Sequence, residues 1–158
     1  MRPGATPTER FNGWFVRPIE KLEELPEGDG AFAALMIALP LYERYIIAKL
    51  KLEDRARGEN EIREEMGNDL NLSDHERRIF WDIFRVGFMH QAMGHDGPTK
   101  WLVSHKYEAL PVFEVIHGQR YVCLDPWKFA RRVLDKYRED ERLIAASESF
   151  PLADVFAI

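Results

Sequence analysis

The sequence has a single cysteine and lacks both a leader-like start and a long apolar run. Cys123, alone in 158 residues, cannot form an internal disulfide, which fits a reducing compartment. Residues 1–10 are polar, unlike a signal peptide. The longest apolar run, residues 31–41, falls well short of the ~20 residues that span a bilayer. The sequence therefore predicts a soluble, cytoplasmic protein that does not bind a membrane.

The signatures of several common site types are also missing. There is no glycine-rich phosphate loop and no nucleophile elbow. The histidines are too scattered for metal-ligand spacing, and one cysteine adds no ligand pair. The net charge of −5 disfavours a general nucleic-acid coat protein, although a small basic site is compatible with it. A DNA-binding role is disfavoured further, because no helix-turn-helix is recognisable. We therefore expect no metal and no cofactor.

What the sequence does contain is enough apolar material for one domain with its own core. At 46% hydrophobic residues, a chain of this length buries roughly 70% of its extended surface. Helical periodicity dominates, so the expected fold class is mainly α. We expect one domain over residues 11–142, after a loose N-terminus (residues 1–10) and before a C-terminal tail (residues 143–158). Its expected helices cover residues 11–25, 31–53, 61–70 and 73–94.

The helix over residues 73–94 is the best defined of these. Ser73 and Glu76 form the S-x-x-E pattern of a capping box, and Gly94 can end the helix in a left-handed conformation. Its apolar residues cover roughly 220° of a helical wheel, against the ~100° stripe of a surface helix. We therefore expect this helix to pack against more than one neighbour, and a second subunit is one candidate.

The C-terminal part changes from helix to strand and back. Residues 112–124 predict a β-hairpin around Gly118-Gln119, a pair suited to a type II′ turn. That turn pairs Phe113 with Leu124 and Val115 with Val122, which gives one apolar face. Asp125-Pro126 then predicts the start of a last helix, with Asp as cap and Pro at the first position. Residues 101–103 are too short to assign, although a strand is compatible with them.

Arg85 and His90 lie late in the predicted helix, within the stretch FRVGFMHQAM. An Arg, four residues and a His near the end of a helical bundle resembles the HEPN superfamily, whose last bundle helix carries an R-x(4–6)-H motif. The aromatic residue before the Arg and the short polar residue after the His are similar to that family's pattern. The resemblance covers roughly residues 11–138. It implies a HEPN-like antiparallel helical bundle with an appended β-hairpin and C-terminal helix.

The same resemblance implies a metal-independent endoribonuclease, usually a homodimer whose two motif helices face each other. By motif position, Arg85 would neutralise the phosphate and His90 would act as general acid or base on the ribose 2′-hydroxyl. The residue types suit this chemistry, since Arg offers a planar, permanently charged fork and His titrates near neutrality. RNA and a second copy of the chain are thus the expected partners. The sequence leaves open a neutralising partner protein.

Three further residues are expected to bind the substrate. Arg78 shares the polar sector of the helical wheel with Arg85, and Gln91 follows His90 directly. Glu43, on the helix over residues 31–53, can orient Arg85 through a salt bridge, and a position on a solvated helix face is its alternative role.

Two features of the motif favour a different interpretation. The residue after the Arg is commonly polar in active family members, and here it is Val86. In a regular α-helix Arg85 and His90 lie about 140° apart, so one site needs a second helix across a dimer interface or a looser helix near Gly87. The alternative is a non-catalytic homodimeric interaction module, in which Arg85 bonds Asp82 at the surface and His90 belongs to the core.

Overall fold

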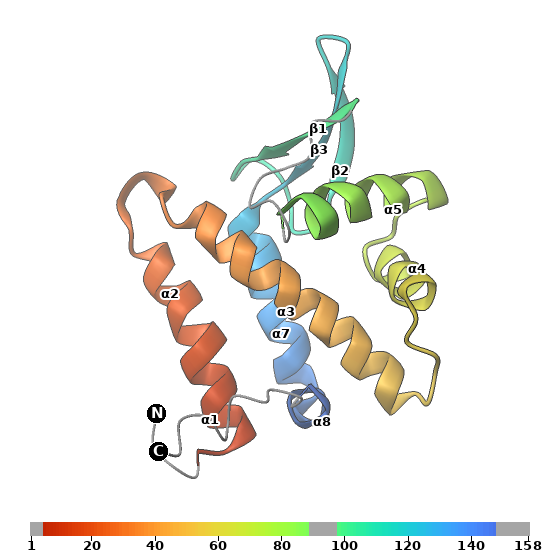
Figure 1. Cartoon of the computed structure of the whole chain (residues 1–158). Helices are drawn as coiled ribbons and strands as arrows, with labels where there is room; N and C mark the ends of the chain where they lie inside the picture. Colours follow the sequence, from red (N-terminus) through yellow and green to blue (C-terminus); the bar gives the residue numbers. More distant parts are fainter. Residues whose placement is uncertain (1–4, 89–97, 148–158) are drawn as a thin grey trace.

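The computed structural model describes residues 5–88 and 98–147, apart from the side chains of Glu27, Arg85, Val86 and Phe88. This part of the protein is mainly helical and carries a small three-stranded mixed sheet, which confirms the predicted fold class at this level. Figure 1 shows the helices gathered around a crossing pair, α3 and α7, with the sheet at one end of the bundle.

The first helical stretch begins earlier than expected. It consists of α1 (Pro7–Phe11), a π-helical segment η1 (Asn12–Val16) and α2 (Arg17–Glu23). The Thr6 hydroxyl accepts from the backbone N–H of Glu9, whose carboxylate accepts from the backbone N–H of Thr6. This capping box starts the helix at Pro7. The expectation of a loose terminus over residues 1–10 is therefore wrong from residue 7 onward. A short 3₁₀ turn, η2 (Pro26–Gly28), follows.

The core is built on α3 (Ala31–Leu52), which crosses and packs against α7 (Pro126–Glu139). Pro40 lies inside α3. By length and composition α3 is apolar enough to cross a membrane, but half of its most apolar stretch is buried inside the protein. Core helices of soluble proteins have this character, so the finding is consistent with the predicted solubility.

The predicted third and fourth helices are present with changed bounds. They are α4 (Glu59–Asp69), α5 (Asp74–Phe80) and the π-helical segment η3 (Trp81–Phe88), which continues α5. The Ser73–Glu76 capping box is confirmed. The expectation of a regular α-helix is wrong over η3, and residues 89–94 lie outside the described residues.

The wide apolar arc of this helix is covered largely by the chain itself. Phe80 and Trp81 are buried, and so are Ile83 and Phe84. The helix contacts α4 through α5 and α3 through η3, which confirms the prediction of more than one neighbour. Burial of these four residues does not require a second subunit.

The sheet contains β1 (Thr99–Val103), β2 (Val112–Ile116) and β3 (Gln119–Leu124) in the order β1-β3-β2. The undecided residues 101–103 belong to β1, which runs parallel to β3. The hairpin β2–β3 is confirmed, with antiparallel pairing. Helix α5 lies beside the hairpin, where Arg120 of β3 contacts His75 (Figure 1).

The turn of the hairpin differs from the prediction by one residue. His117 and Gly118 occupy the two central positions with φ of 49° and 79°, as a type I′ turn requires. Because the turn begins one residue earlier, Phe113 pairs with Val122 rather than Leu124, and Val115 loses Val122 as its partner. Val115 is 67% exposed and does not contribute to the predicted apolar face.

The C-terminal helices continue further than expected. The Asp125 carboxylate accepts from the backbone N–H groups of Trp127 and Lys128, which confirms the predicted start of α7. After Asp140 the chain forms α8 (Glu141–Ala146), whose apolar residues Leu143 and Ile144 are buried. The expected boundary between domain and tail at residues 142 and 143 therefore falls inside a helix. Residues 148–158 lie outside the described residues.

Candidate functional site

The predicted motif begins in the π-helical segment. Arg85 belongs to η3, where the backbone hydrogen bonds of a π-helix join residues five apart instead of four apart. The side chain of Arg85 is not described, and His90 and Gln91 lie outside the described residues. The pairing of Arg85 with His90 therefore stays a prediction.

The two other predicted substrate-binding residues lie on different helices. Arg78 is exposed on α5, and Glu43 is half-buried near the middle of α3. No hydrogen bond joins Arg78 to Glu43 in the part of the chain that the structure describes. Since η3 packs against α3, Glu43 lies on a helix that neighbours the segment of Arg85.

A polar cluster at the end of α4 fastens this helix to the crossing pair. The Asp69 carboxylate accepts from the Tyr42 hydroxyl at 2.7 Å and from Lys136 Nζ at 2.5 Å. Arg132 donates to the backbone carbonyl of Asp69 at 3.2 Å. Burial, followed by the charge of Asp69, raises the pKa of Tyr42 well above its usual value. The hydroxyl therefore stays protonated, and the cluster acts as a structural link.

A second link joins α3 to α4 through Glu65, which is 5% exposed. Its carboxylate accepts from Lys49 and from Arg55, the latter at 2.7 Å. Burial alone would raise the pKa of Glu65, but the two cations together outweigh it and hold the pKa below its usual value. Glu65 is therefore ionised at neutral pH.

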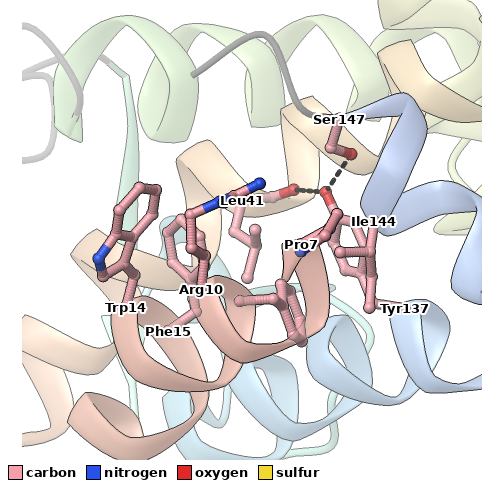
Figure 2. A pocket seen from close by; sticks show the side chains of 9 residues that line it. Pro7, Arg10, Trp14, Phe15, Leu41, Tyr137, Ile144 and Ser147 are labelled. Atoms are coloured by element: carbon pink, nitrogen blue, oxygen red, sulfur yellow. Dashed lines mark hydrogen bonds between the residues drawn. The ribbon is translucent and has the colours of Figure 1, made fainter. Parts of the chain in front are cut away.

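A small cavity lies between the N-terminal helix and the core (Figure 2). The Tyr137 hydroxyl donates to the backbone carbonyl of Leu41 at 3.1 Å and accepts from the Ser147 hydroxyl at 3.3 Å. Burial raises the pKa of Tyr137 to about 12. The cavity holds about 10 Å³, which is room for one water molecule. It is too small for a substrate.

A larger groove, of about 280 Å³, opens between the start of α5 and the hairpin β2–β3. Inside it Arg120 Nη1 lies 2.9 Å from His75 Nε2. A guanidinium has only donors, so His75 Nε2 is the acceptor in this contact. The residues that line the groove are Ser73, His75, Glu76, Phe113, Glu114, Val115 and Arg120.

The Glu76 carboxylate gives this groove a mixed charge. Glu76 Oε2 accepts from the backbone N–H and the hydroxyl of Ser73, and these bonds lower the pKa of Glu76. Its Oε1 atom accepts no hydrogen bond from the described residues. Glu114 borders the groove between Phe113 and Val115, but its side chain lies on the other face of the hairpin, where it accepts from the Tyr107 hydroxyl at 3.2 Å. The groove thus offers one carboxylate beside the donors of Arg120.

Sequence reasoning missed this groove because its residues are distant in the chain. His75 and Arg120 are 45 residues apart, and neither belongs to a recognisable motif. The only local signal was the capping box, which places His75 at the start of a helix. What Arg120 faces depends on the way the hairpin packs against α5.

Among the described residues, no group of three or more His, Cys, Asp or Glu side chains could hold a metal ion. Cys123 is buried in β3, and burial raises the pKa of its thiol, so it is a poor nucleophile. Comparisons of the chain with protein-family models, curated proteins and solved structures find no match.

Proposed function

We propose that the protein is a HEPN-like RNA-binding protein that cleaves RNA without a metal ion, with Arg85 and His90 as its catalytic residues. The proposal includes a HEPN-like bundle and rests on the sequence resemblance. One structural observation supports it, the π-helical hydrogen bonding of η3 (Trp81–Phe88).

The support comes from the spacing of the motif. In an α-helix, residues five apart point about 140° away from each other. In a π-helix, residues five apart are joined by a backbone hydrogen bond and lie about one turn apart. Arg85 belongs to such a segment, and His90 is the fifth residue after it. This is the looser helix that a site formed by both residues of one chain needs. Segments of π-helix are also frequent at functional sites.

The proposed chemistry needs one cation and one acid–base group. Arg85 binds the scissile phosphate and stabilises its developing charge. His90 accepts the proton of the 2′-hydroxyl, whose oxygen attacks the adjacent phosphorus. The bond from phosphorus to the 5′-oxygen breaks, and that oxygen takes a proton from water. The products are a 2′,3′-cyclic phosphate and a 5′-hydroxyl end. A positioned acid–base group of this kind contributes about 10²–10⁴ in rate.

A homodimer remains part of the proposal, as the resemblance implies. A π-helical spacing between Arg85 and His90 would let the pair form without a second chain. The rival interpretation, a non-catalytic dimerisation module, drew on the wide apolar arc of the same helix. Since Phe80, Trp81, Ile83 and Phe84 are buried within one chain, that argument is weaker.

Cleavage of mixed RNA in excess chelator tests the proposal. We expect the wild type to cleave, and Arg85→Ala and His90→Ala to lose at least about 100-fold in rate with unchanged thermal stability. Arg138→Ala is the matched control, because this exposed arginine pairs only with Asp135 among the described residues. No cleavage by the wild type, together with strong destabilisation by His90→Ala, would favour the interaction module.

A further inference from the structure

The side chains that line the groove between α5 and the hairpin belong neither to the Asp69 cluster nor to the Glu65 link. It is open to solvent, and its cation, its carboxylate and its apolar wall come from three different elements. His75, on its rim, precedes Arg85 by ten residues on the same continuous helix. At about 1.5 Å per residue, the two positions are roughly 15 Å apart along the helix. An RNA strand of a few nucleotides spans that length, since phosphates repeat every ~3.4 Å along one strand of a duplex.

The charges in the groove do not suit a bare phosphate. Among the described residues, Arg120 is the one arginine or lysine that lines the groove, and Glu76 lines it as well. The Glu76 carboxylate repels an anion. A ligand with both acceptors and donors fits better, because it can accept from Arg120 and donate to a carboxylate.

The wall formed by β2 is apolar and suits a flat ring. Phe113 is partly buried against the core, and Val115 beside it is 67% exposed. Unstacked RNA bases pack on aromatic side chains in this manner, and their edges then reach polar groups at the sides. A nucleobase in the groove would cover Val115, the most exposed large apolar residue of the described part of the chain.

Guanine matches these groups better than the other bases. Its O6 and N7 atoms accept two hydrogen bonds from an arginine fork, and its N1–H and N2–H₂ groups donate to carboxylates. Adenine presents an N6–H₂ donor beside N7, so one donor of Arg120 would face another donor. We propose that the groove lined by Glu76, Phe113 and Arg120 binds a guanine base of single-stranded RNA. This inference rests on the proposed function for the identity of the polymer.

Binding of uncleavable RNA tests the inference separately from catalysis. The probes are 5′-fluorescein-labelled 2′-O-methyl heptanucleotides of uridine with G, A, C or inosine at the centre, measured by fluorescence anisotropy. A 2′-O-methyl strand lacks the hydroxyl that the proposed cleavage needs. We expect the G probe to bind the wild type at least about fivefold more tightly than the A probe. Inosine, which lacks the N2 amino group, should bind with intermediate affinity.

Three variants separate base recognition from general attraction. Arg120→Lys keeps the charge but loses the fork, so the preference for G should disappear while binding of the A probe persists. Glu76→Gln should also lose the preference, and Gln at residue 76 still supports the capping box. Arg138→Lys, on the surface of α7, should change nothing. Thermal melting of each variant establishes that it is folded.

Each outcome decides for or against the groove. Equal affinity for the four probes, a G preference that survives Arg120→Lys, or no binding of any probe would overturn the inference. The proposed nuclease has its own outcome: cleavage of ordinary RNA without a base preference supports the nuclease alone. A preference for G without cleavage supports the groove and refutes the nuclease.

Discussion

The cluster around Asp69 provides the sharpest test of how the helices are held together. Its carboxylate accepts from the Tyr42 hydroxyl on α3 and from Lys136 on α7, and Asp69 itself ends α4. The side chains of Asp69 and Lys136 are only 11% and 14% exposed. Replacement of Asp69 with alanine would leave a buried hydroxyl and a largely buried ammonium group without their acceptor.

The expected loss follows from these two groups. A buried hydroxyl without its partner costs about 1–3 kcal/mol. Removal of one partner of a buried ion pair costs about 3–5 kcal/mol, and less here, because Lys136 keeps some exposure and also lies 4.8 Å from the Tyr45 ring centre. We expect Asp69→Ala to lower the free energy of unfolding by about 3 kcal/mol, and the melting temperature by roughly 6–12 °C.

Urea denaturation followed by circular dichroism measures this loss. Asp135→Ala is the matched control, since it removes an exposed pair with Arg138 and should cost less than about 0.5 kcal/mol. In a double-mutant cycle with Tyr42→Phe, the two losses should be non-additive, because both remove the same hydrogen bond. The reasoning is refuted if Asp69→Ala costs no more than Asp135→Ala, or if the cycle shows no coupling.

Three further predictions concern stability. Tyr137→Phe should cost about 1–2 kcal/mol in urea denaturation, because Ser147 then loses its buried acceptor; an unchanged midpoint would contradict this. The pKa of Glu65 is lower in the folded state, so its stabilising contribution is complete above the unfolded value near 4.5 and is lost as the pH falls through the lower folded value. The difference in stability between the wild type and Glu65→Gln should therefore shrink below about pH 4.5, whereas a constant difference would be inconsistent with it. Gly30→Ala should cost about 1–3 kcal/mol by thermal melting, because its Cβ would lie 2.1 Å from a backbone oxygen of Leu22. Gly13→Ala, with no atom within 4 Å, serves as its control and should not destabilise.

Local sequence signals account for most of the helix starts. Ser73 with Glu76 and Asp125 with Pro126 predicted where α5 and α7 begin, because a cap forms between residues two or three positions apart. The same rule applies to Thr6 and Glu9, and a closer inspection of that signal would have placed the first helix correctly.

Pairings between distant segments were less predictable. The parallel pairing of β1 with β3 joins residues about twenty positions apart, and nothing within β1 specifies its partner. The hairpin turn was misplaced by one residue, because His117 adopts a positive φ that is uncommon for a residue with a side chain. The choice between neighbouring turns therefore depended on the pairing of the whole hairpin.

The two candidate sites differ in the same respect, since one follows from a local pattern and the other from the packing of distant segments. Arg85 and His90 form a pattern that is visible in the sequence, but the helix type of the segment that carries Arg85 is not, since periodicity does not distinguish η3 from an α-helix. The groove with His75 and Arg120 exists only because the hairpin packs against α5.

The sequence by itself determined the helical class, the caps of α5 and α7, the hairpin and the spacing of Arg85 and His90, because each of these depends on residues that are close in the chain. Only the tertiary structure decided the π-helical bonding of η3, the link between Asp69, Tyr42 and Lys136, and the contact of Arg120 with His75. Those features join side chains or backbone groups whose distance and burial are set by the packing of whole elements, which no local pattern encodes.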